Sequence, residues 1–104
     1  MAKKKRARTL RRERDRVLQK LGDQREKLAR LEAGGSPRRP LTVSSASQVE
    51  PRAENEPCLR CGEAVRAVDH DARTIDGARL RVVTTRCPQC GARRTLYFQL
   101  TDVS

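Results

Sequence analysis

Four cysteines in two pairs constrain this chain more than any other feature. They occur as Cys-Leu-Arg-Cys-Gly at residues 58–62 and as Cys-Pro-Gln-Cys-Gly at residues 87–91, and the chain has no other cysteine. Two residues between ligands let one tight turn aim both sulfurs at one ion, and the glycine after each pair gives this turn its backbone freedom. Zn²⁺ takes four ligands in a tetrahedron. The pattern therefore predicts one structural zinc ion per chain, held by Cys58, Cys61, Cys87 and Cys90.

A thiol redox centre and an iron site are the alternatives to zinc. A redox pair needs an exposed thiolate of low pKa and usually a βαβ setting, and the two pairs indicate neither. Iron also accepts four thiolates, and Cys-Pro-x-Cys-Gly is similar to a rubredoxin knuckle. The only histidine, His70, lies between the pairs. Four thiolates already complete the metal shell, so we expect His70 at the surface.

The segment around the cysteines resembles a zinc ribbon, a family in which each Cys-x-x-Cys-Gly forms a knuckle at the end of a β-hairpin. Residues 87–91 match the family's Cys-Pro-x-Cys-Gly form, residues 58–62 lack the proline, and the likeness covers about residues 57–101. It implies a small zinc-stabilised β fold, a three-stranded antiparallel ribbon, and a role in transcription, translation or protein docking. The closing segment is also similar to that of bacterial proteins that join a helical hairpin to a zinc ribbon, although only one helix is expected here.

Alternating polarity predicts strands at residues 64–68, 79–86 and 93–101, with Asp76-Gly77 as a turn. Few large apolar residues support this sheet, so we expect residues 58–100 to fold only with zinc.

The two faces of the predicted sheet differ in polarity. We expect one face to carry the apolar side chains Leu80, Val82, Leu96, Phe98 and Leu100. The opposite face would then collect Arg79, Arg81, Arg93, Thr95, Tyr97 and Gln99. Arginines that bind phosphates beside an aromatic that stacks on a base are typical of nucleic-acid contacts, which makes Arg93 and Tyr97 candidate binding residues. An ordinary solvated sheet face would look the same.

Residues 9–32 are predicted to form a basic amphipathic helix. Leucine, arginine, lysine, glutamate and glutamine dominate the segment, and Gly34-Gly35 followed by Pro37 ends it. Gly22 lies off the apolar seam and costs about 1 kcal/mol of helix stability relative to alanine. The seam suits a short coiled coil or docking on a partner, and a solvent-exposed helix is the alternative. Its apolar residues are Leu10, Val17, Leu21, Leu28 and Leu31.

The segments on either side of this helix are predicted to be disordered. Residues 1–8 are a basic tail without an apolar anchor, and residues 33–56 are rich in glycine, proline and serine, which is typical of a linker. The tail is also similar to a nuclear localisation signal.

Positive charge is concentrated in residues 1–32, the N-terminal arm of the chain. The net charge is +11, and residues 1–32 hold 13 basic and 5 acidic side chains. Such an arm favours nucleic acid or another polyanion. The candidate contacts are Lys3, Lys4, Lys5, Arg6, Arg8, Arg11 and Arg12.

These features favour a small intracellular zinc-ribbon protein that binds DNA or RNA through its basic arm. The alternative is an adaptor that docks on a polymerase, a ribosome or another nucleoprotein machine. No catalytic constellation is visible, so we expect no enzyme. No apolar run predicts a signal peptide or a membrane span, which favours the cytoplasm and leaves nucleoid and nucleus open.

Overall fold

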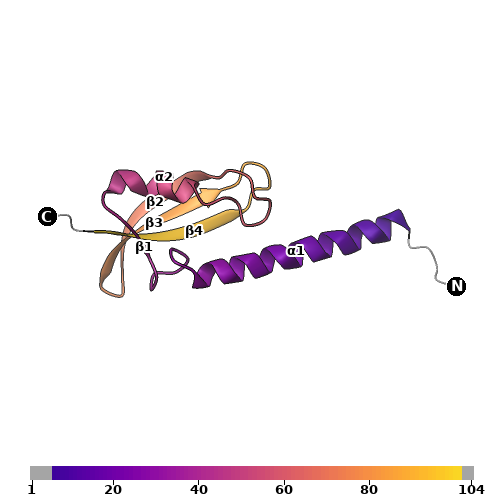
Figure 1. Ribbon diagram of the computed structural model, residues 1–104, viewed down its shortest axis with the longest axis horizontal. Helices are drawn as coiled ribbons and strands as arrows, with labels where there is room; N and C mark the ends of the chain where they lie inside the picture. The colour runs from indigo at the N-terminus through magenta and orange to yellow at the C-terminus, as the bar shows by residue number, and fades with distance from the viewer. Residues whose placement is uncertain (1–5, 102–104) are drawn as a thin grey trace.

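The computed structural model describes residues 6–101 as one long helix followed by a four-stranded mixed sheet. Figure 1 shows the short helix α2 on one side of the sheet and the long helix α1 on the other, projecting well beyond it. The molecule measures 73 × 24 × 17 Å. In chain order the elements are α1 (Ala7–Leu31), β1 (Leu41–Val43), a 3₁₀ turn (Ala46–Gln48), α2 (Val49–Glu54), β2 (Arg66–Ile75), β3 (Ala78–Arg86) and β4 (Arg93–Leu100).

Helix α1 forms close to where the composition places it, at Ala7–Leu31 instead of 9–32. It ends before Gly34, whose φ of 86° is the left-handed conformation that glycine adopts readily. Its buried residues are Gly22 and Ala29. The docked part of the helix is therefore its C-terminal half. Of the predicted tail, residues 1–5 lie outside the described residues.

The prediction that residues 33–56 form a disordered linker is wrong. The segment contains β1, the 3₁₀ turn and α2, and it buries Val43, Val49 and Ala53. The composition of the segment indicated disorder because three small apolar side chains are too few to form a core of their own. They are enough to pack against a sheet that the rest of the chain forms. Backbone hydrogen bonds fix the segment to β4 or the residue after it: the Tyr97 N–H donates to the Gly34 carbonyl, and the Thr101 N–H donates to the Val43 carbonyl, both at 2.8 Å.

The sheet is also larger than the predicted three-stranded antiparallel ribbon. Its strand order is β1-β4-β3-β2, with β2, β3 and β4 antiparallel and β1 parallel to β4. The first antiparallel strand runs from Arg66 to Ile75, beyond the predicted 64–68. It continues up to the turn because Asp76 and Gly77, with φ of 49° and 81°, form a two-residue connection that suits tightly paired strands.

The register of β3 and β4 corrects the predicted faces. Val83 lies opposite Leu96, and Val82 lies opposite Tyr97. Leu96 and Phe98 therefore share a face with Val83 and Arg81, whereas Leu80 and Val82 share the other face with Tyr97. The predicted arginine face is divided, because Arg79 and Arg81 lie on the face that α2 partly covers and Arg93 lies on the face of Tyr97. Val82 and Val83 are adjacent and both buried, so the sequence alone does not show which of them points to which face of the sheet.

Two apolar clusters stabilise the sheet. The larger one lies between α2 and the sheet and comprises Val43, Val49, Ala53, Val83, Leu96 and Phe98. The smaller one comprises Cys58, Val65 and Cys87, with Ala92 packed against it. Since two of its members are cysteines, one end of the sheet depends on the site that these cysteines form.

Candidate functional site

Two backbone turns with the same hydrogen-bond pattern hold the four cysteines. In the first, the Cys58 carbonyl accepts a hydrogen bond from the Gly62 N–H at 2.9 Å, and the Cys58 N–H donates to the Glu63 carbonyl at 2.9 Å. The second repeats both bonds, from Gly91 to Cys87 at 2.8 Å and from Cys87 to Ala92 at 2.9 Å. Both glycines have a φ of 76°. The two tight turns expected from the Cys-x-x-Cys-Gly spacing are thus present, but only the second lies between two strands, β3 and β4, whereas the first lies between α2 and β2.

The knuckles bring four sulfurs together. All four Sγ atoms lie within 4.8 Å of one another. The Cys58–Cys90 and Cys61–Cys87 sulfur pairs are 3.5 and 3.3 Å apart, and all four thiols are free. A tetrahedron with metal–sulfur bonds of about 2.3 Å has sulfur–sulfur edges of about 3.8 Å, which matches this spacing. The four cysteines can therefore coordinate one metal ion, with Cys58 and Cys87 on its buried side.

Hydrogen bonds from the knuckle backbone favour thiolates at the two buried positions. The Cys90 N–H lowers the pKa of Cys87 to about 7, although burial acts in the opposite direction. At Cys58 burial raises the pKa, but the N–H groups of Cys61 and Arg60 outweigh it and the pKa falls below its ordinary value. Thiolates are the form that binds metal. The backbone is thus arranged to support ligation at both buried sulfurs.

The exposed Cys61 differs from the two buried cysteines in the direction of its pKa shift. The Glu63 N–H lowers the pKa of Cys61, but hydrogen bonds with the sulfurs around it outweigh this and raise the pKa to about 12. Four thiolates in contact repel one another, and a bound cation removes that repulsion. The arrangement is therefore suited to a metal ion and poorly suited to four free thiolates.

His70 does not belong to the metal group that the described residues form. Its predicted surface position is wrong in part, because the imidazole is only 16% exposed and its Nδ1 lies 4.0 Å from Glu50 Oε1 on α2. The register places His70 opposite Val83 on the face that α2 covers, which explains its burial.

The first knuckle docks on α1, a contact that was not predicted from the sequence. The Arg60 guanidinium donates to Glu26 Oε1 at 2.9 Å and to Asp23 Oδ1 at 2.7 Å. The same side chain lies over Gly22, where an added Cβ would come within 2.6 Å of Arg60 Nη1. Arg25 Nη1 also donates to the Leu59 carbonyl at 3.4 Å. A glycine inside an otherwise strong helix was the available signal for a close approach.

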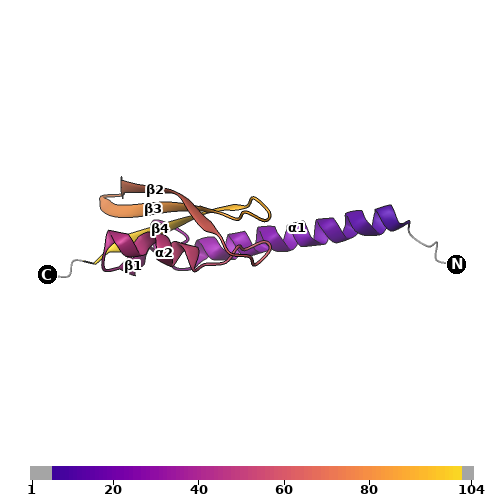
Figure 2. The same ribbon diagram turned by 90° about the horizontal axis from the view of Figure 1, so that it is seen from above.

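The predicted nucleic-acid residues fall into two groups. Arg8, Arg11 and Arg12 lie on the projecting half of α1, Arg6 directly precedes the helix, and all four are exposed. Lys3, Lys4 and Lys5 lie outside the described residues. Figure 2 shows this half of α1 extending beyond the sheet.

Arg93 and Tyr97 lie elsewhere, beside the C-terminal half of α1. They border an open hollow of about 360 Å³ between α1 and β4. Its lining is Glu26, Ala29, Arg30, Gly35, Leu59, Arg93, Arg94, Thr95 and Tyr97. The structure therefore brings the predicted pair together with Arg30 and Arg94, and apart from the basic half of α1.

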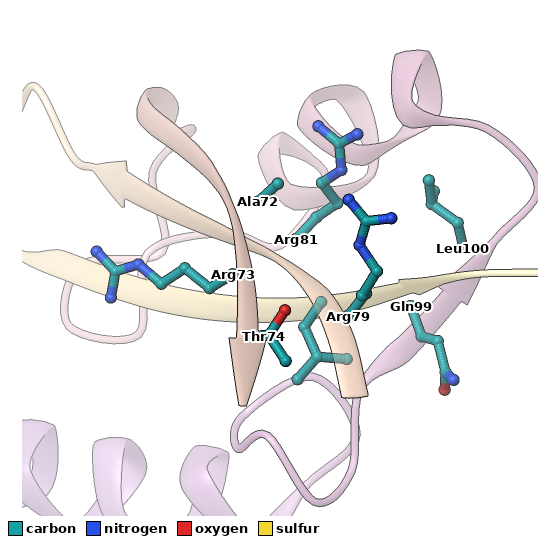
Figure 3. Close-up of a pocket in the computed structure, with 8 residues that line it drawn as sticks. Ala72, Arg73, Thr74, Arg79, Arg81, Gln99 and Leu100 are labelled. Carbon is teal, nitrogen blue, oxygen red and sulfur yellow. The ribbon is translucent and has the colours of Figure 1, made fainter. Parts of the chain in front are cut away.

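A second open hollow, of about 490 Å³, lies at the hairpin end of β3, away from the cysteines. Figure 3 shows the guanidinium groups of Arg79 and Arg81 on the same side, with Arg73 directed away from them. Arg73 is paired with Asp71 at 3.3 Å. Arg79 and Arg81 therefore share one face, as the sequence predicts, but Arg93 and Tyr97 do not belong to it.

The seam residues of α1 are exposed in the structure. Leu10, Val17, Leu21, Leu28 and Leu31 are 42–68% exposed, because the helix docks through Gly22 and Ala29 on another face. The helix thus offers an apolar stripe along nearly its whole length.

Comparison of the chain with protein-family models, with curated proteins and with solved structures finds no match. Within residues 6–101, no helix is long and apolar enough to cross a membrane.

Proposed function

We propose that this chain is a zinc-ribbon protein that binds nucleic acid, without enzymatic activity, through the basic N-terminal half of α1 and the tail before it. Zinc is the proposed metal because four cysteine thiolates in two Cys-x-x-Cys-Gly knuckles form a closed tetrahedral shell. Such a shell leaves no open position for a reacting water, which suits a structural role.

The observation that carries the proposal is the charge of the projecting half of α1. Residues 6–18 hold six arginines, one glutamate and one aspartate, a net of +4. Arg8, Arg12 and Arg16 are four residues apart, so they form one row with steps of about 6 Å along the helix. This row lies opposite the leucine stripe. A helix with such a row can place several guanidinium groups on a phosphate backbone at once.

The sheet end of the molecule contributes in two ways. Arg60 on the first knuckle forms salt bridges with Asp23 and Glu26, and these bonds hold α1 in one direction relative to the folded body. The hollow beside β4 adds Arg93 and Tyr97, where a base of a single strand could stack on the half-buried aromatic ring. Duplex binding would then depend mainly on the helix, and single-strand binding on both surfaces.

The experiment is a titration of zinc-loaded full chain against fluorescent duplex and single-stranded oligonucleotides at several salt concentrations. We expect log affinity to fall linearly with log salt, by ~0.9 per neutralised phosphate on duplex DNA. Replacing Arg8, Arg12 and Arg16 with glutamine should weaken duplex binding and reduce the slope by up to about 2.7.

A matched variant removes three charges elsewhere. Arg38, Arg66 and Arg79 are exposed and lie outside α1, and their replacement with glutamine should leave the slope nearly unchanged. Equal losses in both variants would show that only net charge matters and would contradict a site on α1. Undetectable binding by the unaltered chain at low salt would refute the proposed function.

The adaptor role is the second candidate, and the exposed leucine stripe favours it. Contacts through leucines tolerate salt, whereas contacts through arginines and phosphates weaken steeply with it. A partner retained at about 0.5 M salt and lost when Leu21 and Leu28 are changed would favour the adaptor.

A further inference from the structure

The apolar stripe of α1 holds most of the exposed large apolar side chains of the described chain. Eight large apolar side chains are exposed in residues 6–101, and six of them lie on α1. Five form the stripe, namely Leu10, Val17, Leu21, Leu28 and Leu31, and the sixth is Leu18, at its edge. The folded body docks about a third of a turn away, through Gly22 and Ala29. The stripe is therefore free to receive a partner along its whole length.

The N-terminal half of α1 lacks support of its own. Every residue of the helix before Gly22 is exposed except Glu13, which is half-buried. Arg6 makes no side-chain capping bond, and the first turn holds no acidic residue. Arginines there lie at the positive end of the helix dipole, which is unfavourable. Because helices in water gain most of their stability from packing, a partner on the stripe would stabilise this half.

We propose that a second copy of the chain supplies this partner, with the two α1 helices packed antiparallel about a two-fold axis at Gln19. In this register each stripe residue meets an apolar residue of the other copy. The layers pair Ala7 with Leu31, Leu10 with Leu28, Arg14 with Gln24, and Val17 with Leu21, and each layer occurs twice.

The two polar interruptions of the stripe select the register. Arg14 and Gln24 are the seam positions that are not apolar, and about this axis they face each other. A shift of one heptad in one direction would put Arg14 against Val17, and a shift in the other would put it against Leu31. Either shift buries a charged side chain among apolar ones, which is costly. A polar layer that fixes register is an established device in coiled coils.

Charge selects the antiparallel orientation. Residues 6–18 have a net charge of +4, whereas residues 20–32 hold four basic and three acidic side chains, a net of +1. A parallel pair would place +4 beside +4 along the whole N-terminal half. An antiparallel pair places +4 beside +1 at each end, and it also sets the positive end of each helix dipole beside the negative end of the other.

Leu18 provides a separate indication. It lies off the seam and is 61% exposed, so the folded chain alone gives it no role. Near the proposed axis it flanks the seam and meets Leu18 of the second copy, while a parallel pair would place it beside Glu13. Lys20 also approaches Lys20 of the second copy near the axis, but each long side chain can turn its ammonium group to solvent.

This pairing does not depend on nucleic-acid binding. It leaves the row of Arg8, Arg12 and Arg16 on the outer side of each helix, opposite the seam. Two basic rows would then face away from the seam at opposite ends of one dimer. Stabilised N-terminal halves would present these rows in fixed positions.

Site-directed photocrosslinking tests the orientation and the register. A photoreactive benzoylphenylalanine replaces Leu10 in the zinc-loaded full chain, at high salt and after nuclease treatment. The expected product joins residue 10 to the segment around Leu28. Within one helix these positions are about 27 Å apart, so this product forms only between two copies. Crosslinks to the segment around Leu10 of another copy would overturn the antiparallel arrangement.

Sedimentation under the same conditions tests the stripe. The expected mass is twice the 11.8 kDa of the chain at high concentration and falls towards one chain on dilution. Leu21→Asp with Leu28→Asp should give one chain at every concentration. Thr9→Asp with Gln19→Asp adds the same two charges to exposed positions off the stripe and should leave the dimer intact. Zinc content is measured for each variant. A monomeric unaltered chain, or a dimer that survives both leucine changes, would overturn the proposal.

Discussion

Replacing Val49 with alanine tests whether residues 33–56 are part of the folded unit. Val49 is 0% exposed at the start of α2, in a cluster with Val43, Val83, Leu96 and Phe98. The change removes two buried methyl groups, worth about 1.6 kcal/mol of transfer free energy. It leaves a cavity of roughly 50 Å³, which at ~24 cal/mol per Å³ adds about 1.2 kcal/mol. We therefore expect a loss of about 2–3 kcal/mol in the free energy of unfolding.

The assay is urea unfolding followed by far-ultraviolet circular dichroism, with free zinc held constant by a metal buffer because bound metal adds to stability. With an m-value of about 1 kcal/mol/M for a chain of this size, the midpoint should fall by roughly 2–3 M.

Val68→Ala is the matched control. Val68 is 53% exposed on β2, so the same chemical change should cost about 0.5 kcal/mol or less. Equal midpoints for the two variants would show that α2 does not pack on the sheet, and would restore the view of residues 33–56 as a linker.

Three further predictions concern the metal and two glycines. Chelation of the metal, or Cys87→Ser, should abolish the dispersed amide signals of the sheet in NMR spectra; a dispersed spectrum without metal would contradict a zinc-dependent fold. Gly22→Ala adds about 1 kcal/mol of helix propensity but displaces the Arg60 side chain. Amide hydrogen exchange at residues 22–31 should therefore slow less in this single variant than in the double variant with Arg60→Ala, and equal slowing in both would refute the contact. Gly35→Ala would place a Cβ 1.9 Å from the Ala29 carbonyl oxygen, so it should lower the thermal midpoint measurably, and an unchanged midpoint would contradict the close approach.

Local features of the chain were readable from the sequence. The two Cys-x-x-Cys-Gly pairs indicated a shared metal site, and the four sulfurs do lie within coordinating distance. Helix α1 and the turn at Asp76-Gly77 were found close to their predicted positions. The helix and the turns depend on residues a few positions apart, so propensity and spacing are enough to specify them. The two cysteine pairs are far apart in the chain, but their shared ligand chemistry indicated that they meet.

Only the tertiary structure decided the features that join distant residues. Leu41 to Val43 form a strand because β4, more than 50 residues later, offers an edge to pair with. The faces of β3 follow from its register with β4, which adjacent valines leave undetermined. Gly22 is a contact site because Arg60, 38 residues away, lies over it. Such contacts cost chain entropy that only the assembled core repays, so no local pattern in the sequence announces them.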